Sequence, residues 1–283
     1  MKKLVGHILI FSLGLFGYIS VYPIKCDLCN QKIYESNNHW SNYWNEDYHE
    51  HHKGELPACY SCDRLISEKN CTNYIHKNGG KKIIDGRWVC NIYLRTSDLI
   101  YFNYDADELL TQITDLLLRK GISIPKIFDL NLVYEDELST IRNSVLRHGE
   151  KNPALMSISL QKKTFANHIN TNTNCKVYVL SGLERYFFIS CLAHEMMHVW
   201  IEVNIGFDLH PKYEEGLCNY IAFKVLEDWD YHEYKSYNLA KIKQSPDPIY
   251  GDGFREIKKL AYDFPKISNL LNYIKYNPSK FGK

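Results

Sequence analysis

Two histidines and a glutamate stand at the spacing that forms hydrolytic metal sites. His194, Glu195 and His198 make up the pattern HExxH, which reads HEMMH at residues 194–198. On an α-helix, residues four apart are offset by only about 40°, so both imidazoles can present a ring nitrogen to one metal ion. Glu195 would then lie beside the open coordination position, where it can take a proton from a metal-activated water. The pattern therefore predicts a zinc site with Glu195 as general base.

A catalytic zinc needs a third protein ligand, and two adjacent glutamates follow at a suitable distance. Glu214 and Glu215 come after a connection that predicts one helix ending near residue 206 and a second running from about residue 211 to residue 229. Gly216 follows Glu215, and its lack of a side chain would let the second helix approach the first closely. We favour Glu215 as the ligand, with Glu214 as the group that orients a ligating histidine.

The residues before the HExxH pattern predict the elements that position it. Residues 176–180 are β-branched and apolar, Ser181 and Gly182 supply a turn, and residues 191–201 contain no Gly or Pro. These features predict a strand that runs directly into a buried helix. Peptidases of this kind often hold an extended substrate against such a strand. The alternative is an exposed helix that carries two histidines by chance, and the apolar residues between the ligands favour the buried helix.

A second group of metal-type residues lies towards the N-terminus. Cys26 and Cys29 form one CxxC pair, and Cys59 and Cys62 form another. Each pair supplies half of a tetrahedral zinc site, so two pairs predict zinc knuckles. The alternative is a disulfide framework, although the chain has nine cysteines and an odd count leaves one thiol over. Three further cysteines accompany the predicted strand and helices and are expected to be core thiols: Cys175, Cys191 and Cys218.

The order of these motifs resembles that of the plant LIM-domain metallopeptidases, which are activated by ubiquitin and restrain organ growth. The pattern of HExxH followed by Glu-Gly also resembles the gluzincin class of peptidases. The matching segments span most of the chain after residue 25: KCDLCNQ (25–31), PACYSCDR (57–64), LAHEMMHVW (192–200), EEGLC (214–218) and PIYGDGFR (248–255). The resemblance implies a gluzincin-like peptidase with His194, His198 and Glu215 on zinc and Glu195 as general base.

The same resemblance implies structural zinc in the N-terminal region. The family closes its first knuckle with a C-x2-H pair, where this chain has Glu46 three residues before His49. This implies Cys26, Cys29, His49 and Glu46 as the ligands of a first structural zinc.

The family ends its second knuckle with C-x2-C, where this chain has Cys90 followed by Tyr93. Tyrosine is a poor zinc ligand, so Cys71 or His76 would substitute for the missing thiolate, or the second zinc is absent. The preferred set for this knuckle is Cys59, Cys62, Cys90 and Cys71. One catalytic zinc and one or two structural zinc ions are therefore expected.

The first 25 residues have the pattern of an export signal. Lys2 and Lys3 are followed by an uncharged stretch from residue 4 to residue 24. This predicts a secretory signal peptide, or alternatively an uncleaved N-terminal anchor. Because the two lysines stay inside, the catalytic part is expected outside the cytoplasm, secreted or periplasmic.

The remaining chain predicts an α+β fold in two regions. Strands are expected at residues 126–133, 155–160 and 175–180, forming a small sheet beside the catalytic helices. Helices are expected at 106–120 and, after the catalytic pair, at 231–243, 254–262 and 267–276. We predict a LIM-like region at residues 26–97 and a gluzincin-like metallopeptidase domain at residues 98–283.

The charge of the chain narrows the choice of partner. A net charge of +1 gives no field that attracts nucleic acid or an anionic membrane. We therefore expect a protein or peptide substrate, with membrane contact only through the N-terminal segment, and the sequence makes no prediction of oligomeric state.

Two further points stay open at this level. Tyr250 and Arg255 lie in a Gly-rich stretch, where either one can donate to an oxyanion or can simply be a turn tyrosine and a solvated arginine. Two functions are compatible with the motifs: an exported zinc endopeptidase, or a zinc-held protein-binding module joined to an inactive peptidase domain.

Overall fold

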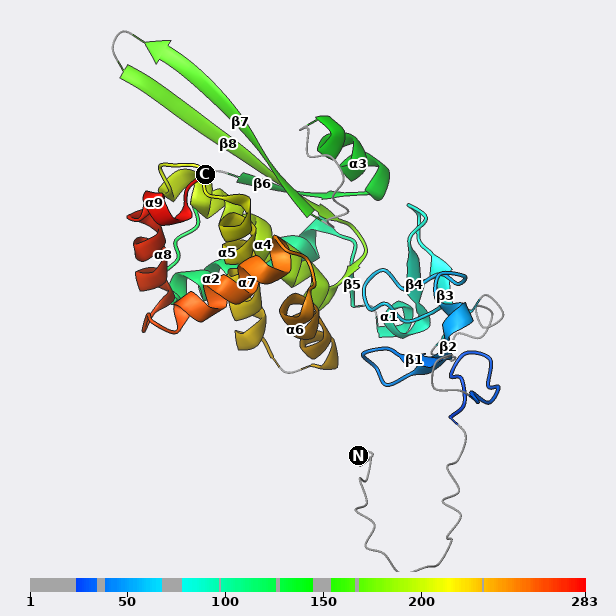
Figure 1. Cartoon of the computed structure of the whole chain (residues 1–283). Helices are drawn as coiled ribbons and strands as arrows, with labels where there is room; N and C mark the ends of the chain where they lie inside the picture. Colours follow the sequence, from blue (N-terminus) through cyan, green and yellow to red (C-terminus); the bar gives the residue numbers. More distant parts are fainter. Residues whose placement is uncertain are drawn as a thin grey trace, which may run out of the picture. The chain divides into compact units, whose positions relative to one another are not determined.

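The computed structural model describes residues 24–34, 39–67, 78–96, 98–125, 128–144, 154–165, 168–230 and 232–283. These residues fall into two compact units, which meet in the sequence between Lys53 and Gly54 (Figure 1). The predicted boundary after residue 97 does not coincide with this division. Residues 54–67 and 78–96 contact segments beyond residue 180 instead: Tyr237 Oη of α6 donates to Asp63 Oδ2 over 2.5 Å, and Arg87 donates to the Ser181 carbonyl in the turn before α4.

The N-terminal unit is too small to be held by apolar packing alone. Its strands β1 (His39–Ser41) and β2 (Asp47–His49) pair antiparallel and lead into a 3-10 helix, η2 (Glu50–His52). Among its described residues the buried apolar side chains are Cys26, Ile33 and Tyr48. Domains of this size usually need a metal, a disulfide or a partner to fold. A structural metal ion would therefore supply stability that the small apolar core of this unit lacks.

The C-terminal unit begins with short strands around the second CxxC pair. Strands β3 (Gly80–Lys82) and β4 (Trp88–Cys90) pair antiparallel, and the helix α1 (Asn91–Thr96) follows at once. Strand β5 (Leu99–Ile100) then pairs with β9 (Leu183–Glu184), which immediately precedes the helix of the HExxH pattern. These pairings join the cysteine-bearing segment to the C-terminal helices.

A three-stranded mixed sheet lies beside the helices, as the sequence predicts. Its order is β6 (Phe128–Val133), β8 (His168–Leu180) and β7 (Ala154–Phe165), with β6 parallel and β7 antiparallel to β8. The hairpin of β7 and β8 extends well beyond the sheet (Figure 1). Both strands are longer than predicted. The sequence did not indicate their outer parts, because residues 161–174 are mostly polar and lack the apolar alternation that marks a half-buried strand.

Helices dominate the C-terminal unit (Figure 1). Helix α5 packs against both α4 and α7. The α+β class is confirmed, and the structure adds helices α1, α3 and α9, which the sequence did not predict. The bounds are α2 (Asn103–Arg119), α3 (Glu135–Ser144), α4 (Arg185–Asn204), α5 (Pro211–Asp228), α6 (Glu233–Gln244), α7 (Tyr250–Ala261), α8 (Ile267–Lys275) and α9 (Pro278–Phe281).

The helix α4 begins where its sequence supplies a turn and a cap. Gly182 adopts a φ of 74°, a conformation that favours glycine, so the chain can reverse between β8 and β9. The Glu184 carboxylate then accepts hydrogen bonds from the backbone N–H groups of Tyr186 and Phe187 at 2.9 and 3.0 Å. Glu184 is completely buried. Burial outweighs these bonds and raises the pKa of Glu184 from 4.5 to about 7.

This buried cap predicts a pH-dependent stability. Between about pH 4.5 and 7 the folded state keeps the proton on Glu184 and the unfolded state has lost it, so stability falls as the pH rises through this window and levels off above it. The expected change is roughly 3 kcal/mol. Glu184→Gln stays neutral, so the difference in unfolding free energy between wild type and variant should change across the window. Urea titrations at several pH values measure it, and an equal difference at pH 5 and pH 8 would contradict the assignment.

The glycine after Glu215 serves a different contact from the predicted one. Gly216 faces α7 rather than α4: a Cβ built on it would lie 2.3 Å from the carbonyl carbon of Gly253 and 2.5 Å from its oxygen. In turn, a Cβ on Gly253 would lie 2.1 Å from the carbonyl oxygen of Lys212. The backbones of α5 and α7 therefore meet through two glycines, directly behind the site residues of α5.

Gly216→Ala is expected to lower stability and to displace Glu215. The added methyl group meets backbone atoms that cannot rotate away, and such overpacking costs about 1–3 kcal/mol. A Gly→Ala change within a helix would otherwise gain up to about 1 kcal/mol from helix propensity, so the loss is a net effect. Thermal unfolding compares this variant with Gly206→Ala, where a Cβ would meet nothing within 4 Å. Equal melting temperatures for the two variants would show that the helices can separate without cost.

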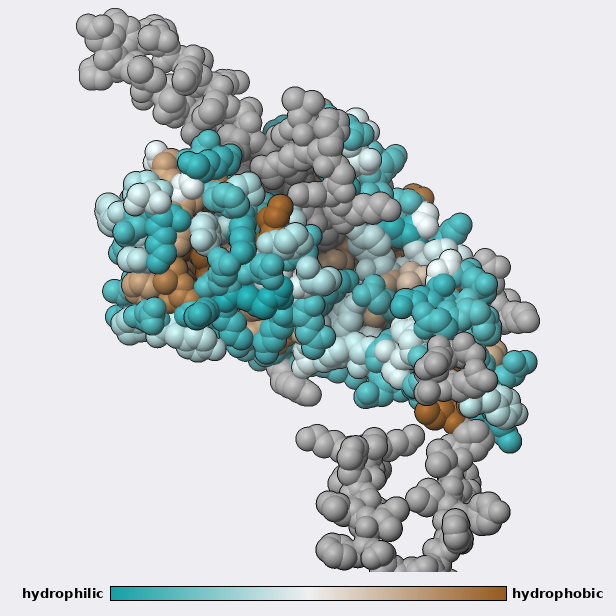
Figure 2. All heavy atoms as spheres, in the orientation of Figure 1, coloured by the Kyte–Doolittle hydropathy of each residue, from teal (hydrophilic) through white to brown (hydrophobic). Residues whose placement is uncertain are grey.

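The surface and the N-terminal segment bear on the export prediction. Figure 2 shows a largely hydrophilic face over the C-terminal helices. Within the described residues, none of the helices combines the length and apolarity needed to cross a bilayer. The predicted signal or anchor falls almost entirely on residues 1–23, which lie outside the described residues, so export stays a prediction.

Candidate metal centre

Three polar atoms from α4 and α5 converge on one point. His194 Nε2 lies 3.2 Å from His198 Nε2 and 3.1 Å from Glu215 Oε2, and His198 Nε2 lies 3.4 Å from the same carboxylate oxygen. Ligands about 2.0–2.1 Å from a tetrahedral zinc lie about 3.3 Å from one another. The three atoms therefore stand at the separations expected of ligands around one zinc ion, which are also hydrogen-bonding distances.

Two further polar residues fix the orientation of the histidine rings. Asn219 Oδ1 lies 2.9 Å from Nδ1 of His194, and Glu214 Oε1 lies 3.1 Å from Nδ1 of His198. Each oxygen can accept the Nδ1 proton, which leaves the Nε2 lone pair directed at the shared point. The structure thus places Glu214 at Nδ1 of His198 and Glu215 at Nε2 of both histidines.

The electrostatics of the site favour a positive charge. Burial by itself would lower the pKa of His198, but the neighbouring Cys218, Glu214 and Glu215 raise it well above its usual range. Burial also opposes the charge on Glu215, yet hydrogen bonds with His194 and His198 hold the pKa of its carboxyl well below its ordinary value. A cation placed here would therefore meet an ionised carboxylate in buried surroundings.

Cys218 adds a thiol that the sequence assigned to the core. Its sulfur and ring nitrogens of His194 and His198 all lie within 4.8 Å of one another, so these three residues form a possible His-His-Cys metal site. Cys218 follows Glu215 by three residues on α5 and is completely buried. The described chain thus offers two candidates for the third ligand, a carboxylate and a thiol on the same helix face.

The catalytic candidates Glu195 and Tyr250 both lie near His194. Glu195 follows it on α4 and is buried. The Tyr250 ring is 6.2 Å from the His194 ring, centroid to centroid, and its carbonyl accepts a hydrogen bond from Asn219 Nδ2 at 3.1 Å. Arg255 is occupied elsewhere, donating to the Ser245 carbonyl at 2.8 Å. The described site therefore brings Tyr250, and not Arg255, beside a predicted metal ligand.

Tyr250 is the first residue of helix α7, whereas the sequence had suggested a turn at this position. Asp247 Oδ1 accepts from the backbone N–H groups of Ile249 and Tyr250, both at 2.8 Å, and so caps α7. An aspartate followed by proline just before a helix is a helix-start signal that could have located this element. The glycines of α7 are explained by close backbone approach and not by a turn.

A cavity of about 630 Å³ adjoins the predicted metal ligands. Its lining comes from the second CxxC segment, from α4, α5 and α6, and from the start of α7. The lining residues are Ala58, Cys59, Tyr60, Asp63, Phe187, Ser190, Cys191, His194, Asn219, Asn238, Lys241, Ile242, Ser245, Asp247 and Tyr250.

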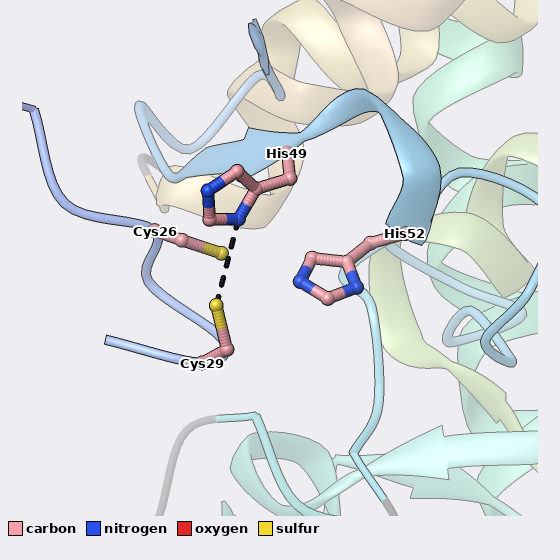
Figure 3. Close-up of side chains that lie close together, drawn as sticks. All are labelled: Cys26, Cys29, His49 and His52. Carbon is pink, nitrogen blue, oxygen red and sulfur yellow. Dashed lines mark hydrogen bonds between the residues drawn. The ribbon is translucent and has the colours of Figure 1, made fainter. Parts of the chain in front are cut away.

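The N-terminal unit brings four metal-type side chains together (Figure 3). Cys26, Cys29, His49 and His52 point towards one another, with ligand atoms all within 4.8 Å and Cys29 Sγ 3.5 Å from His49 Nδ1. His52 takes the place that the sequence reading gave to Glu46. The carboxylate of Glu46 is engaged elsewhere, because it accepts from the Tyr48 hydroxyl at 2.6 Å. The spacing His49-x2-His52 mirrors the CxxC pair and was the missed signal.

The second thiol group is incomplete within the described residues. Cys59, Cys62 and Cys90 are buried, with their sulfurs within 4.8 Å of one another. The two remaining candidates for a fourth ligand, Cys71 and His76, lie outside the described residues. Tyr93 is completely buried after Cys90, and its hydroxyl has no hydrogen-bond partner in the part that the structure describes.

No cysteine that the structure describes is paired in a disulfide, which gives no support to the disulfide alternative. Cys175 and Cys191 are buried as free thiols, as expected for core cysteines, whereas the buried free thiol of Cys218 lies beside His194 and His198. The described cysteines of the CxxC pairs instead gather with histidines or with one another, as cysteines do in metal-binding clusters.

Fold and site together define a class of protein: a mixed α+β chain whose HExxH helix and following helix converge on one metal-type centre, with Cys and His clusters before it. Comparison with known proteins narrows this class. Residues 123–238 match the DA1-like family model, described as Protein DA1. The match spans His194, Glu195, His198 and Glu215.

Curated relatives extend the similarity to most of the chain. Protein DA1-related 7 of Arabidopsis thaliana is 23% identical over 296 residues, covering 84% of this chain and 50% of that protein. Protein DA1 of the same plant is 26% identical over 296 residues, with 84% and 53% covered. LIM domain-containing protein HDR3 of Oryza sativa subsp. japonica is 25% identical over 244 residues, with 74% and 46% covered.

The chain spans about half the length of the curated relatives it matches. No solved structure matches it. The similarity to DA1-like, LIM domain-containing proteins therefore stands at about 25% identity and is carried by sequence.

Proposed function

We propose that this protein is a zinc-dependent peptidase that hydrolyses peptide bonds in protein or peptide substrates. The observation that carries the proposal is the convergence of His194 Nε2, His198 Nε2 and Glu215 Oε2 within 3.1–3.4 Å. The two histidines share helix α4 with Glu195, and Glu215 comes from α5. The similarity to the DA1-like family supports it, because the matched region contains all four residues.

We assign the catalytic zinc to His194, His198 and Glu215. Glu215 is preferred over Cys218 because its oxygen lies at ligand separation from both ring nitrogens and its side chain keeps 14% of its surface exposed, which leaves room for a reactant beside it. Bound zinc would polarise the substrate carbonyl and lower the pKa of a water molecule.

The protein groups around this centre have separate tasks in the proposed reaction. The Glu195 carboxylate takes a proton from the attacking water and passes it to the leaving amine. Asn219 and Glu214 hold the two imidazoles in the tautomer that leaves Nε2 unprotonated. Tyr250, beside His194, would donate its hydroxyl proton to the negative oxygen that develops on the attacked carbonyl.

The Cys and His clusters complete the proposal. We propose that Cys26, Cys29, His49 and His52 hold one structural zinc and that Cys59, Cys62 and Cys90 contribute to a second. Sulfur and imidazole ligands at this spacing suit zinc. For residues 1–25 we retain export as a proposal, which secretion of a reporter fused to this segment would test.

The proposed activity is tested on an unstructured protein such as β-casein. Purified protein with measured zinc content should cleave it, lose cleavage on treatment with 1,10-phenanthroline, and recover cleavage when zinc is returned. Cleavage that persists after the catalytic zinc is shown to be removed would contradict the proposal. Protein that carries full zinc and leaves a broad substrate panel intact would favour the binding-module alternative.

A further inference from the structure

The cavity beside His194 is built from parts of the chain that are distant in sequence. Tyr60 comes from the second CxxC segment, Phe187 from α4 and Ile242 from α6, and all three side chains line it. Each side chain is half-buried: it packs against the main core, and part of its surface stays exposed. Because His194 also lines the cavity, a group bound there would lie directly beside the proposed metal ligands.

The larger part of the cavity surface is apolar, although polar side chains also line it. The rings of Tyr60 and Phe187 lie 6.2 Å apart, centroid to centroid, and Ile242 adds a branched aliphatic surface. Aromatic pairs at this distance attract one another and leave ring faces and edges for a third apolar group. The volume of about 630 Å³ falls within the roughly 300–1,000 Å³ of typical ligand sites.

The charged groups of the lining are already engaged with other parts of the protein. Lys241 Nζ lies 3.4 Å from Asp63 and 5.3 Å from the centre of the Phe187 ring. The Asp63 carboxylate also accepts a hydrogen bond from the Tyr237 hydroxyl at 2.5 Å. Asp247 caps α7 through two backbone N–H groups. Lys241 thus balances the charge of Asp63, and backbone N–H groups bind the Asp247 carboxylate. The apolar surface that remains favours an uncharged apolar group inside.

The wall formed by Tyr60 is held in place before any ligand arrives. Its backbone N–H donates to the Trp88 carbonyl at 2.9 Å, and the Arg87 guanidinium lies 4.9 Å from the centre of its ring. Arg87 is itself fixed by Asp85 at 2.7 Å. Because Tyr60 lies between Cys59 and Cys62 in the sequence, a metal on those thiolates would fix the same segment.

We propose that this cavity is the specificity pocket of the peptidase and takes a large apolar or aromatic side chain from a residue next to the bond that is cleaved. The proposal rests on the proposed function for its reaction. The pocket itself is defined by Tyr60, Phe187 and Ile242, and the second CxxC segment thereby acts as a wall of the substrate site.

The first test compares cleavage of a mixed peptide library by wild type and pocket variants. Wild type should enrich Phe, Tyr, Leu or Met at one position beside the cleaved bond. Phe187→Ala should lower kcat/KM for a Phe substrate by roughly 10–200-fold relative to its Ala counterpart. Ile242→Asp, at a half-exposed site, should shift the preference away from apolar residues without a large effect on folding. The control Phe102→Ala removes an exposed ring outside the cavity and should leave the profile unchanged.

A second test separates this proposal from the proposed function, because it measures binding without turnover. Glu195→Gln protein is titrated with fluorescent peptides that differ only in one Phe or one Ala, and anisotropy reports the affinity. Tighter binding of the Phe peptide, lost on adding Phe187→Ala, supports the pocket even if wild type cleaves nothing. Binding or cleavage with no preference for large apolar residues overturns the pocket and leaves the peptidase proposal standing.

Discussion

Glu195→Gln should strongly slow peptide cleavage while the zinc stays bound at His194, His198 and Glu215. The amide has nearly the shape of the carboxylate but cannot accept a proton at neutral pH. Glu195 is not one of the three groups that converge on the metal point, so its change should leave His194, His198 and Glu215 in place. Loss of a general base alone costs about 10²–10⁴-fold in rate, and that fall is the expected result.

The measurement pairs cleavage rates with zinc content by atomic emission for the same preparations. Glu202→Gln is the matched control, since Glu202 is exposed on the same helix α4 and should change neither quantity. A Glu195→Gln enzyme with near wild-type rate would remove Glu195 from the mechanism. If zinc is lost together with activity, Glu195 acts on the metal centre itself. Zinc-loaded wild type that is as inactive as the variant would favour a binding module.

The catalytic helices were predictable because their signals are local. The spacing of His194 and His198 depends only on helix periodicity, and an uninterrupted apolar segment around them predicts a buried helix. The preference for Glu215 over Glu214 came from the resemblance to the Glu-Gly pattern of the gluzincin class, and the expected packing of Gly216 against α4 was not found. The structure places Glu215 towards both histidines and Glu214 behind His198.

The errors concern contacts that local spacing does not define. Gly216 was expected to face α4, but it meets Gly253 of α7, a residue far along the chain. Glu46 was predicted as a zinc ligand because it stands three residues before His49 in the sequence. In the structure its carboxylate binds the Tyr48 hydroxyl, and His52 lies beside the cysteines instead. In both cases the residue type was read correctly, and the partner depended on the direction of a neighbouring element.

The cavity shows the same limit for the substrate site. Lys241 and Asp63, which meet at its rim, stand 178 residues apart in the sequence. No periodicity or motif joins a CxxC segment to a helix at that distance, because the contact is tertiary: Lys241 lies on α6 and meets Asp63 only in the folded chain. Substrate preference therefore becomes open to inference only once the fold is known.

Substitution of the candidate third ligands should affect zinc affinity to different degrees. Glu215→Ala should lower affinity for the catalytic zinc by more than the roughly 10–100-fold that loss of an orienting group costs. Glu214→Ala removes only the partner of His198 Nδ1 and should fall within that range. Cys218→Ala should keep the zinc and most of the activity, losing about 1–2 kcal/mol of stability for a buried sulfur.

Competition with a chromophoric chelator, on protein whose cysteine clusters are already filled, ranks the three variants. The expected order of zinc loss is Glu215→Ala, then Glu214→Ala, then Cys218→Ala. The order follows from geometry: Glu215 Oε2 lies at 3.1 and 3.4 Å from the two ring nitrogens, which is the separation that a shared tetrahedral ion imposes. A reversed order, with zinc lost from Cys218→Ala and retained by Glu215→Ala, would assign the thiol as ligand. Glu215 would then be free to act on the reactants, and the division of roles between it and Glu195 would have to be measured anew.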